Sequence, residues 1–364
     1  MEKNNLTAVM RHFRLQGTVQ TVAAMGEGLI NDTFKATTIE ADAPDYVLQR
    51  INHHVFQDVE LLQRNIEIVT RHIRKKLQQQ GETDIERKVL RFVPADNGKT
   101  WWRDESTGYW RVSVFIPRSH TRNEVTPDNA YQAGAAFGHF EQMLVDVEHS
   151  LGETIPDFHN MELRMTQLKD AVITDNAGRL GEVSKELDLI SRHAEEMCHA
   201  EQLYREGKLP KRICHCDTKV NNMLFDEDGN VLCVIDLDTV MPSFVFSDYG
   251  DFLRTAANTV AEDSPEVEKV QFRHDIFEAF TRGYLKHAHQ FLTPQEISML
   301  PFAVALFPMM QAVRFLTDYL NGDTYYKTQY PAHNLVRTRN QLQLFRHIAE
   351  NKERITSFIE NFEK

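Results

Sequence analysis

The stretches Ile213–Phe225, ICHCDTKVNNMLF, and Val231–Asp238, VLCVIDLD, carry the most information about the fold of this chain. Residues 226–230 between them read DEDGN, and an Asp-Gly pair is a strong signal for a tight turn. The sequence therefore predicts a short β-hairpin, with a polar loop that holds Asp217 and Lys219 just before its first strand.

The hairpin and its loop contain the residue types that phosphoryl transfer to a hydroxyl requires. That chemistry needs a carboxylate for the hydroxyl proton, oxygen ligands for Mg²⁺ and a cation near the transferred group. We predict Asp217 as the catalytic base and Lys219 as the catalytic cation. Asn222 and Asp236 are predicted to bind Mg²⁺, because the folded hairpin brings Asp236 back beside the loop. Asp238 fits a metal ligand and a structural residue equally well.

The wider pattern predicts an α+β chain. Residues 20–50 alternate short apolar runs with turn residues, as successive antiparallel strands do. Residues 56–80 have apolar side chains at spacings of three and four, which predicts one long helix, and strand patterns then resume. After Pro117 the patterns are mainly helical. We therefore expect an antiparallel-sheet lobe that binds the nucleotide at residues 1–118 and a mainly helical lobe with the substrate site at 119–364.

Composition limits the partners. The chain has 364 residues, of which 41% are hydrophobic, enough for a large core. Its formal net charge of -12 argues against nucleic acid and against an anionic membrane surface as main partners. The N-terminus lacks a signal-peptide layout, and no stretch is expected to span a bilayer, so a cytoplasmic location is predicted. Cys214 and Cys216 are separated by one residue, a spacing that does not favour zinc.

Two glycines fall between the first two predicted strands, in the stretch 26–34, GEGLINDTF. A flexible turn at Gly26 and Gly28 is expected to lay backbone N–H groups over phosphates. A plain hairpin turn is the alternative, because two glycines alone do not specify an anion site.

The pattern His-x-Asp-x-x-x-x-Asn, followed by Ile-Asp-x-Asp, resembles the catalytic and metal-binding motifs of aminoglycoside phosphotransferases, choline kinases and, more distantly, protein kinases. This resemblance implies a protein-kinase-like bilobal fold with ATP and Mg²⁺ as cofactors. It assigns the catalytic base to Asp217 and the metal to Asn222 and Asp236. It also implies that His215 is a buried brace of the loop, and that Asp251 opens a helix and holds the loop through backbone hydrogen bonds.

The resemblance leaves the cation that clamps the nucleotide phosphates open. Relatives usually carry a Lys or Arg in the third strand, where this chain has Gln49, with Arg50 beside it on the opposite face. Both positions are predicted to lie near the nucleotide. Glu60 and Glu67 in the long helix are the candidate acidic partners of such a cation.

Segments spread from about residue 26 to residue 323 resemble the N-acetylhexosamine 1-kinases. They are GLINDTFK, LQRIN, AGAAFGHF, IPDFHNMELR, HCDTKVNNMLF, IDLDTVMPS, SDYGDFLRTAAN and VRFLTDYLNGD. This resemblance implies transfer of the γ-phosphate of ATP to the anomeric hydroxyl of N-acetylglucosamine or N-acetylgalactosamine, which are small sugar substrates.

Four residues are candidates for contact with such a sugar. Arg314 and Asp318 lie four apart on a helix expected to begin at Thr293, so they share a face. They are predicted to hydrogen-bond the substrate, and an ordinary intrahelical ion pair is the alternative. Asn31 and His159 are the other two candidates.

Two other functions stay open. A kinase for choline or homoserine would need an acidic, aromatic-lined pocket for its cationic substrate. A nucleotide-binding regulator without catalysis is the second, and Gln49 is the feature that favours it. The chain is expected to be a monomer or a small homo-oligomer.

Overall fold

The computed structural model describes residues 3–26 and 30–362 of the chain, and the chain divides into two compact units. We call them the sheet unit and the helical unit. The sheet unit comprises Met1–Arg122, Asp146–Pro156 and Asn221–Met241, and the helical unit comprises Asn123–Val145, Asp157–Val220 and Pro242–Lys364. The predicted α+β class, with an antiparallel sheet first and helices after it, is confirmed.

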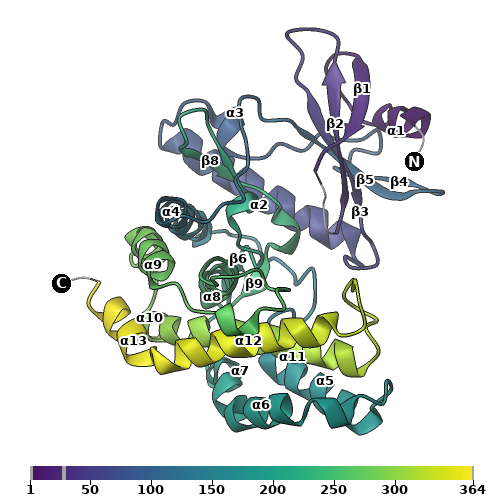
Figure 1. Cartoon of the computed structure of the whole chain (residues 1–364). Coiled ribbons are helices and arrows are strands. Elements are labelled where there is room, and N and C mark those ends of the chain that lie inside the picture. Colours follow the sequence, from purple (N-terminus) through teal and green to yellow (C-terminus); the bar gives the residue numbers. More distant parts are fainter. Residues whose placement is uncertain (1–2, 27–29, 363–364) are drawn as a thin grey trace. The chain divides into compact units, whose positions relative to one another are not determined.

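The sheet unit is built on a five-stranded antiparallel sheet with the strand order β1-β2-β3-β5-β4 (Figure 1). Its strands are β1 (Val19–Ala24), β2 (Asp32–Thr38), β3 (Tyr46–Ile51), β4 (Trp102–Asp104) and β5 (Gly108–Val114). Leu48 pairs with Val112, and both lie in an apolar cluster on one face. Because side chains alternate between faces, the next pair, Gln49 and Arg111, belongs to the opposite face.

Three helices and a hairpin complete the sheet unit. They are α1 (Lys3–Met10), α2 (Val59–Gln79), α3 (Ile85–Lys88), β7 (Met223–Phe225), β8 (Val231–Val234) and the short 3₁₀ turn η3 (Leu237–Thr239). The long helix predicted at 56–80 is confirmed as α2, which begins after Asp58, whose side chain accepts from the N–H of Leu61. The predicted hairpin is also confirmed, with Leu224 paired to Cys233 and Gly229 in the left-handed conformation its turn requires.

The helical unit holds the remaining helices and two very short strands. They are α4 (Pro127–Leu144), α5 (Met161–Thr174), η1 (Leu180–Glu182), α6 (Ser184–Met197), α7 (His199–Arg205), β6 (Arg212–Cys214), β9 (Met241–Ser243), α8 (Phe246–Ala256), η4 (Val267–Lys269), α9 (His274–Ala288), α10 (Pro294–Ser298), α11 (Leu300–Leu320), α12 (His333–Glu350) and α13 (Lys352–Glu360). The 3₁₀ turn η2 (Val220–Asn222) lies where the chain passes from the helical unit to the sheet unit.

The helix that begins at Thr293 is shorter than expected. Thr293 forms the predicted capping box with Glu296, but this helix, α10, ends at Ser298. Arg314 and Asp318 therefore lie on a separate helix, α11, which has Pro301 in its first turn. Pro301 has no backbone N–H with which to continue the hydrogen bonds of α10, and proline is well suited to the first turn of a new helix.

α11 also corrects the expectation that no stretch is long and apolar enough to span a bilayer. Its 21 residues meet that criterion by length and composition. Most of the helix is buried in the helical unit, where it packs against α5, α8 and α12. A core position of this kind accounts for the apolar composition.

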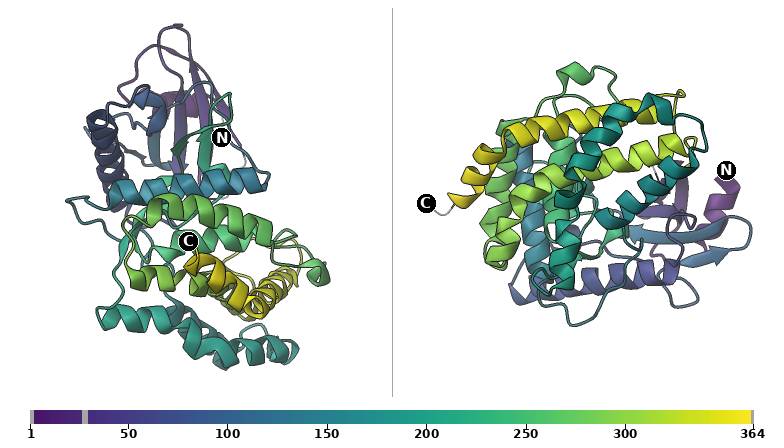
Figure 2. Two further views of the ribbon diagram at one scale, coloured as in Figure 1. Left: turned by 90° about the vertical axis from the view of Figure 1, so that its left-hand side faces the viewer. Right: turned by 90° about the horizontal axis from the view of Figure 1, so that it is seen from below.

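Helices α4 and α9 lie side by side in the helical unit at unusually short distance (Figure 2). A Cβ added to Gly134 of α4 would lie 2.1 Å from the carbonyl oxygen of Phe280 in α9. One added to Gly283 of α9 would lie 2.0 Å from the carbonyl oxygen of Tyr131. The stretch AGAAFGHF therefore contains glycine because two helix backbones meet there.

We expect Gly134→Ala to lower the free energy of unfolding by roughly 1–3 kcal/mol, because a methyl group in this contact overpacks it. Chemical denaturation of the purified protein measures the change. Gly181→Ala is the matched control, since no atom lies within 4 Å of its added Cβ. Equal unfolding midpoints for the two variants would contradict the role of close helix contact.

Candidate active site

The predicted catalytic loop follows strand β6 in the helical unit and is held by Asp248 of α8. Its carboxylate accepts from the backbone N–H groups of His215 and Cys216, each at 2.7 Å. The prediction that Asp251 holds the loop is therefore wrong. Because α8 begins at Phe246, Asp248 lies in the first turn beside the loop, whereas Asp251 lies almost one turn further on.

His215 is a buried brace of this loop, as predicted. Its side chain has no exposed surface, and the edges of its ring contact Phe137 and Phe140 of α4. Its Nδ1 atom accepts from the backbone N–H of Asp217 at 3.3 Å. Between the two, Cys216 has a φ of 62°, a left-handed conformation that is uncommon outside glycine. The loop is thus fixed in a conformation that needs support from its surroundings.

Asp217 and Lys219 form an ion pair at 2.5 Å, and both side chains are about one-third exposed. Burial lowers the pKa of Lys219, but the carboxylates of Asp217 and Asp251 outweigh it and leave that pKa raised. Asp251 in turn pairs with Arg254, which also binds Glu262. The structure therefore places the two predicted catalytic residues together, and Lys219 stays positively charged.

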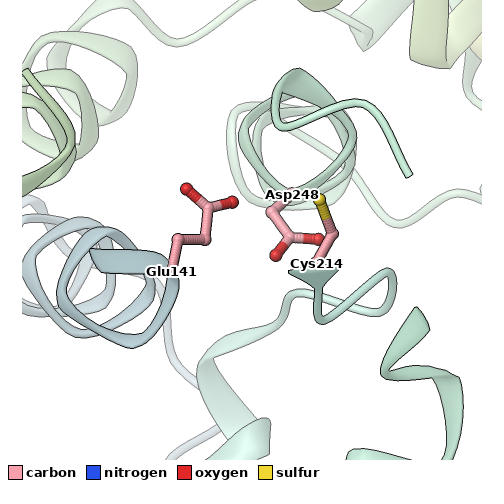
Figure 3. Close-up of side chains that lie close together, drawn as sticks. All are labelled: Glu141, Cys214 and Asp248. Atoms are coloured by element: carbon pink, nitrogen blue, oxygen red, sulfur yellow. The ribbon is translucent and has the colours of Figure 1, made fainter. Parts of the chain in front are cut away.

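Two acidic groups and a thiol form a buried cluster where β6 leads into the loop (Figure 3). Potential ligand atoms of Glu141, Cys214 and Asp248 lie within 4.8 Å of one another, and all three residues are buried. Burial and the neighbouring charge of Asp248 raise the pKa of Glu141 well above its ordinary value, which favours the neutral acid. Burial also raises the pKa of the Cys214 thiol. A neutral acid, a neutral thiol and a carboxylate already bound to two N–H groups do not suit a metal ion.

The two predicted metal ligands belong to the sheet unit and flank the open end of the β7–β8 hairpin. Met223 pairs with Val234, and the N–H of Ile235 donates to the carbonyl oxygen of Asn222 at 2.9 Å. This pairing brings Asn222 next to the end of the strand that leads into Asp236, which has a φ of 59°. One amide oxygen and one carboxylate are hard oxygen donors of the kind that Mg²⁺ prefers, so the residues fit this ion. Their role as ligands stays a prediction.

Of the predicted nucleotide residues that the structure describes, Gln49 and Arg50 lie on β3, and Gly26 follows β1. Gly26 has a φ of 71° with open space around its Cα, and Gly28 lies outside the described residues. Gln49 donates to Thr33 and accepts from the Nε of Arg111 at 2.9 Å. Arg50 is on the opposite face, paired with Asp32. Arg111 was not anticipated from the sequence, although the strand pattern YWRVSV placed it on the face opposite Trp110.

Two of the predicted substrate residues are engaged in supporting hydrogen bonds. In the sheet unit, Asn31 donates to Asp238 at 2.6 Å and accepts from the N–H of Asn52. In the helical unit, Asp318 accepts from the backbone N–H groups of Tyr325 and Tyr326. Asp318 thus shapes the segment after α11, and direct sugar contacts for Asn31 and Asp318 stay predictions.

The other two, His159 and Arg314, belong to what we call the arginine–aromatic cluster of the helical unit. Its members are Phe158, His159, Arg164, Arg314, Tyr325 and Tyr326. The Arg314 guanidinium lies 5.4 to 6.0 Å from three aromatic ring centres and donates to Gln311 rather than pairing with Asp318. Sequence reasoning missed Arg164, whose only signal was its place in IPDFHNMELR.

The cluster contains two arginines, and the acidic residue that acts on Arg164 is Asp157. Burial and the nearby charge of Arg314 lower the pKa of Arg164 to about 10, so Arg164 is still charged at neutral pH. Burial, with added repulsion from these arginines, lowers the pKa of His159 well below its ordinary value. Among the described residues, no carboxylate forms an ion pair with Arg164 or Arg314. The Nε of Arg164 and the Nδ1 of His159 are buried without a hydrogen-bond partner in the same set.

Comparison with known proteins identifies the family. A model of the phosphotransferase enzyme family matches residues 21–288. An aminoglycoside phosphotransferase from Alicyclobacillus acidocaldarius is 15% identical, with a TM-score of 0.61 over 98% of this chain and 96% of that chain. An amicoumacin kinase in complex with AMP-PNP and Ca²⁺ is 13% identical, with a TM-score of 0.62 over 94% and 93%.

A choline/ethanolamine kinase family protein from Mesorhizobium loti is 16% identical, with a TM-score of 0.54 over 98% of this chain and 97% of that chain. At such identities the structural likeness shows a shared fold and no more. The family model, in contrast, covers well over half of the sequence. This protein therefore belongs to the phosphotransferase enzyme family.

Proposed function

We propose that this protein is a small-molecule kinase that uses Mg²⁺ and ATP to phosphorylate the anomeric hydroxyl of an N-acetylhexosamine, giving the sugar 1-phosphate. When bound, Mg-ATP supplies the phosphoryl group and neutralises part of its charge. The residues of this chain orient and deprotonate the acceptor. Asp217 accepts the hydroxyl proton, and Lys219, its ion-pair partner, contributes positive charge near the transferred group.

The arginine–aromatic cluster is the observation that favours a sugar over a cationic acceptor. Arg314 offers forked N–H donors beside aromatic rings, which suits the oxygen atoms and the apolar face of a sugar ring. Neighbouring charges connect this cluster to the catalytic loop: Arg254 pairs with Asp251 and acts on His159, and the charges of Asp217 and Lys219 act on Asp251. The cluster and the base therefore belong to one charged region of the helical unit.

The same cluster argues against choline, homoserine and other amine-bearing acceptors. A quaternary or primary ammonium group is bound by carboxylates and open aromatic faces. Here the Arg314 guanidinium already lies near the rings, and Arg164 adds a second positive charge close to it. A second positive charge would be repelled at these distances.

A regulator without catalysis is supported less well. Gln49 is the feature in its favour, but the Asp217–Lys219 pair and the supported loop around it have no evident use in a protein that only binds a nucleotide. Buried hydrogen bonds and a left-handed Cys216 that fix one catalytic carboxylate are typical of an active site.

A coupled assay of ATP consumption tests the proposal with N-acetylglucosamine, N-acetylgalactosamine, choline and homoserine as acceptors. We expect turnover with at least one N-acetylhexosamine and with neither amine. Turnover with choline or homoserine alone would overturn the sugar assignment, and no turnover with any acceptor despite nucleotide binding would favour the regulator.

A matched pair of variants in the same assay connects the cluster to the acceptor. Arg314→Met is expected to raise the KM for the sugar about 10- to 100-fold, as loss of charge-assisted hydrogen bonds does, with little effect on the KM for ATP. Arg192→Met is the control, because this arginine is exposed on α6 and pairs only with Asp188 one turn away. An unchanged KM for the sugar in Arg314→Met would show that the arginine–aromatic cluster does not bind the substrate.

A further inference from the structure

A row of polar side chains crosses the sheet at the position where the sequence lacks the expected cation. Thr33 of β2 pairs with Gln49 of β3, and Gln49 pairs with Arg111 of β5. Residues paired across antiparallel strands lie on the same face, and hydrogen bonds join all three side chains. The positive charge missing from β3 is therefore present one strand away, on the same face.

Arg111 is buried to a degree that is rare for an arginine. Its exposed fraction is 2%, and its Nη1 lies 2.5 Å from Oδ1 of Asp238, which is equally buried. Neither of these two atoms makes a hydrogen bond of regular geometry with another described residue. A buried ion pair costs desolvation energy that its own attraction barely offsets, so it is weak as a purely stabilising device.

Asp238 connects Arg111 to the segment that carries the predicted metal ligand. It lies two residues after Asp236, and its other oxygen accepts from Asn31, the residue just before β2. Its backbone carbonyl is bound by Thr154. Asp238 is thereby held by Asn31 and Thr154. Its ion pair places the Arg111 guanidinium beside the segment that follows the β7–β8 hairpin, within the same unit.

The other basic and acidic residues considered for this role are engaged elsewhere. Arg50 projects from the opposite face, where it pairs with Asp32 and is 39% exposed. Of the two helix acids, Glu60 pairs with Lys99, and Glu67 accepts from Thr100. No described contact joins either acid to a cation of β3 or β5.

We propose that Arg111 is the residue that binds the nucleotide phosphates, with β5 supplying the cation that relatives carry on β3. This inference rests on the proposed kinase function. Gln49 and Asp238 engage Nε and Nη1, and a guanidinium has five N–H donors, so donors remain for phosphate oxygens. The planar fork suits two such oxygens at once. In this proposal Asp238 positions the Arg111 guanidinium. Of the two roles considered for Asp238, metal ligand and structural residue, it therefore has the structural one.

Calorimetric titration of the full-length protein with adenosine, ADP and AMP-PNP, each with EDTA and with Mg²⁺, tests this assignment without relying on turnover. For Arg111→Met we expect adenosine to bind within about twofold of wild type. ADP and AMP-PNP should bind about 10- to 100-fold more weakly, the usual loss for a charge-assisted hydrogen bond. Uniform weakening of all three ligands, or no weakening, would overturn the proposal.

Arg111→Met leaves the Asp238 carboxylate without its ion-pair partner, so this variant can fold poorly. Two further variants keep the test valid in that case. Arg111→Lys retains the charge, loses the fork and should weaken ADP binding with adenosine unchanged. Gln49→Lys combined with Arg111→Met returns the cation to β3 and should recover most of the ADP affinity, a rescue that a merely structural arginine would not permit. Failure of both expectations refutes the assignment.

Lys35→Met is the matched control, because Lys35 lies in the same sheet and pairs with Asp45. The Lys35→Met variant should bind all three ligands as wild type does. If it bound only ADP and AMP-PNP more weakly, the total positive charge of the sheet, and not Arg111 in particular, would account for phosphate binding. If the wild-type protein binds neither ADP nor AMP-PNP, the kinase proposal itself fails. Normal wild-type binding with an unaffected Arg111→Met variant overturns only the inference about Arg111.

Discussion

Asp217→Asn is expected to lower kcat at least about 100-fold, the usual contribution of a positioned proton acceptor, while the protein stays folded. The amide has nearly the shape of the carboxylate but cannot take the hydroxyl proton. It also removes the charge that pairs with Lys219. Because both side chains are about one-third exposed, the lost ion pair should change stability little.

Steady-state kinetics with the accepted sugar and a thermal melt of the same preparation measure these two effects separately. Asp188→Asn is the control, since Asp188 is an exposed aspartate on α6 with an arginine partner one turn away. We expect the control to match wild type in both measurements. A kcat for Asp217→Asn within a few-fold of wild type would remove Asp217 from the role of base.

Local patterns in the sequence were enough to predict the elements around the site. The apolar spacing of residues 56–80 predicted α2, and the Asp-Gly pair predicted the turn between β7 and β8. These signals act over a few residues, so they do not depend on the rest of the chain. The buried position of His215 was implied instead by the resemblance of its motif to that of known kinases.

The residues that the sequence did not reveal depend on contacts between distant segments. Asp248 and Asp251 are three residues apart on one helix, and only the start of α8 at Phe246 decides which of them reaches the loop. Helix ends cannot be fixed to one residue from sequence patterns alone. Arg111 and Gln49 are 62 positions apart, and strand alternation tells which face each occupies but not which strands are neighbours.

Arg164 was missed for a related reason. It lies in the first turn of α5, where an arginine is normally solvated, and only the chain fold places it near Arg314. Proximity of like charges is a property of the folded helical unit. Such clusters cannot be recognised before the folded arrangement is known.

The second large effect is expected for Asp248→Asn, at the support of the loop rather than at the reacting atoms. The Asp248 carboxylate accepts two buried backbone N–H groups, from His215 and Cys216, with one oxygen for each. An asparagine retains one acceptor and turns an NH₂ group toward the other donor, which leaves that buried N–H unsatisfied. We expect the free energy of unfolding to fall by about 2–4 kcal/mol and kcat to fall at least about tenfold.

Two neighbouring substitutions distinguish this effect from general damage to the core. Glu141→Gln should behave nearly as wild type, because burial keeps Glu141 neutral and glutamine can still accept from the Tyr284 hydroxyl and donate toward Asp248. Asp251→Asn affects a residue that pairs with Arg254 and accepts no N–H from the loop, so we expect it to destabilise the protein less than Asp248→Asn. Denaturant unfolding together with kcat measures all three. If Asp251→Asn lost more stability and turnover than Asp248→Asn, Asp251 would be the residue that holds the loop. The reason is that loss of the residue that holds the loop must also displace Asp217.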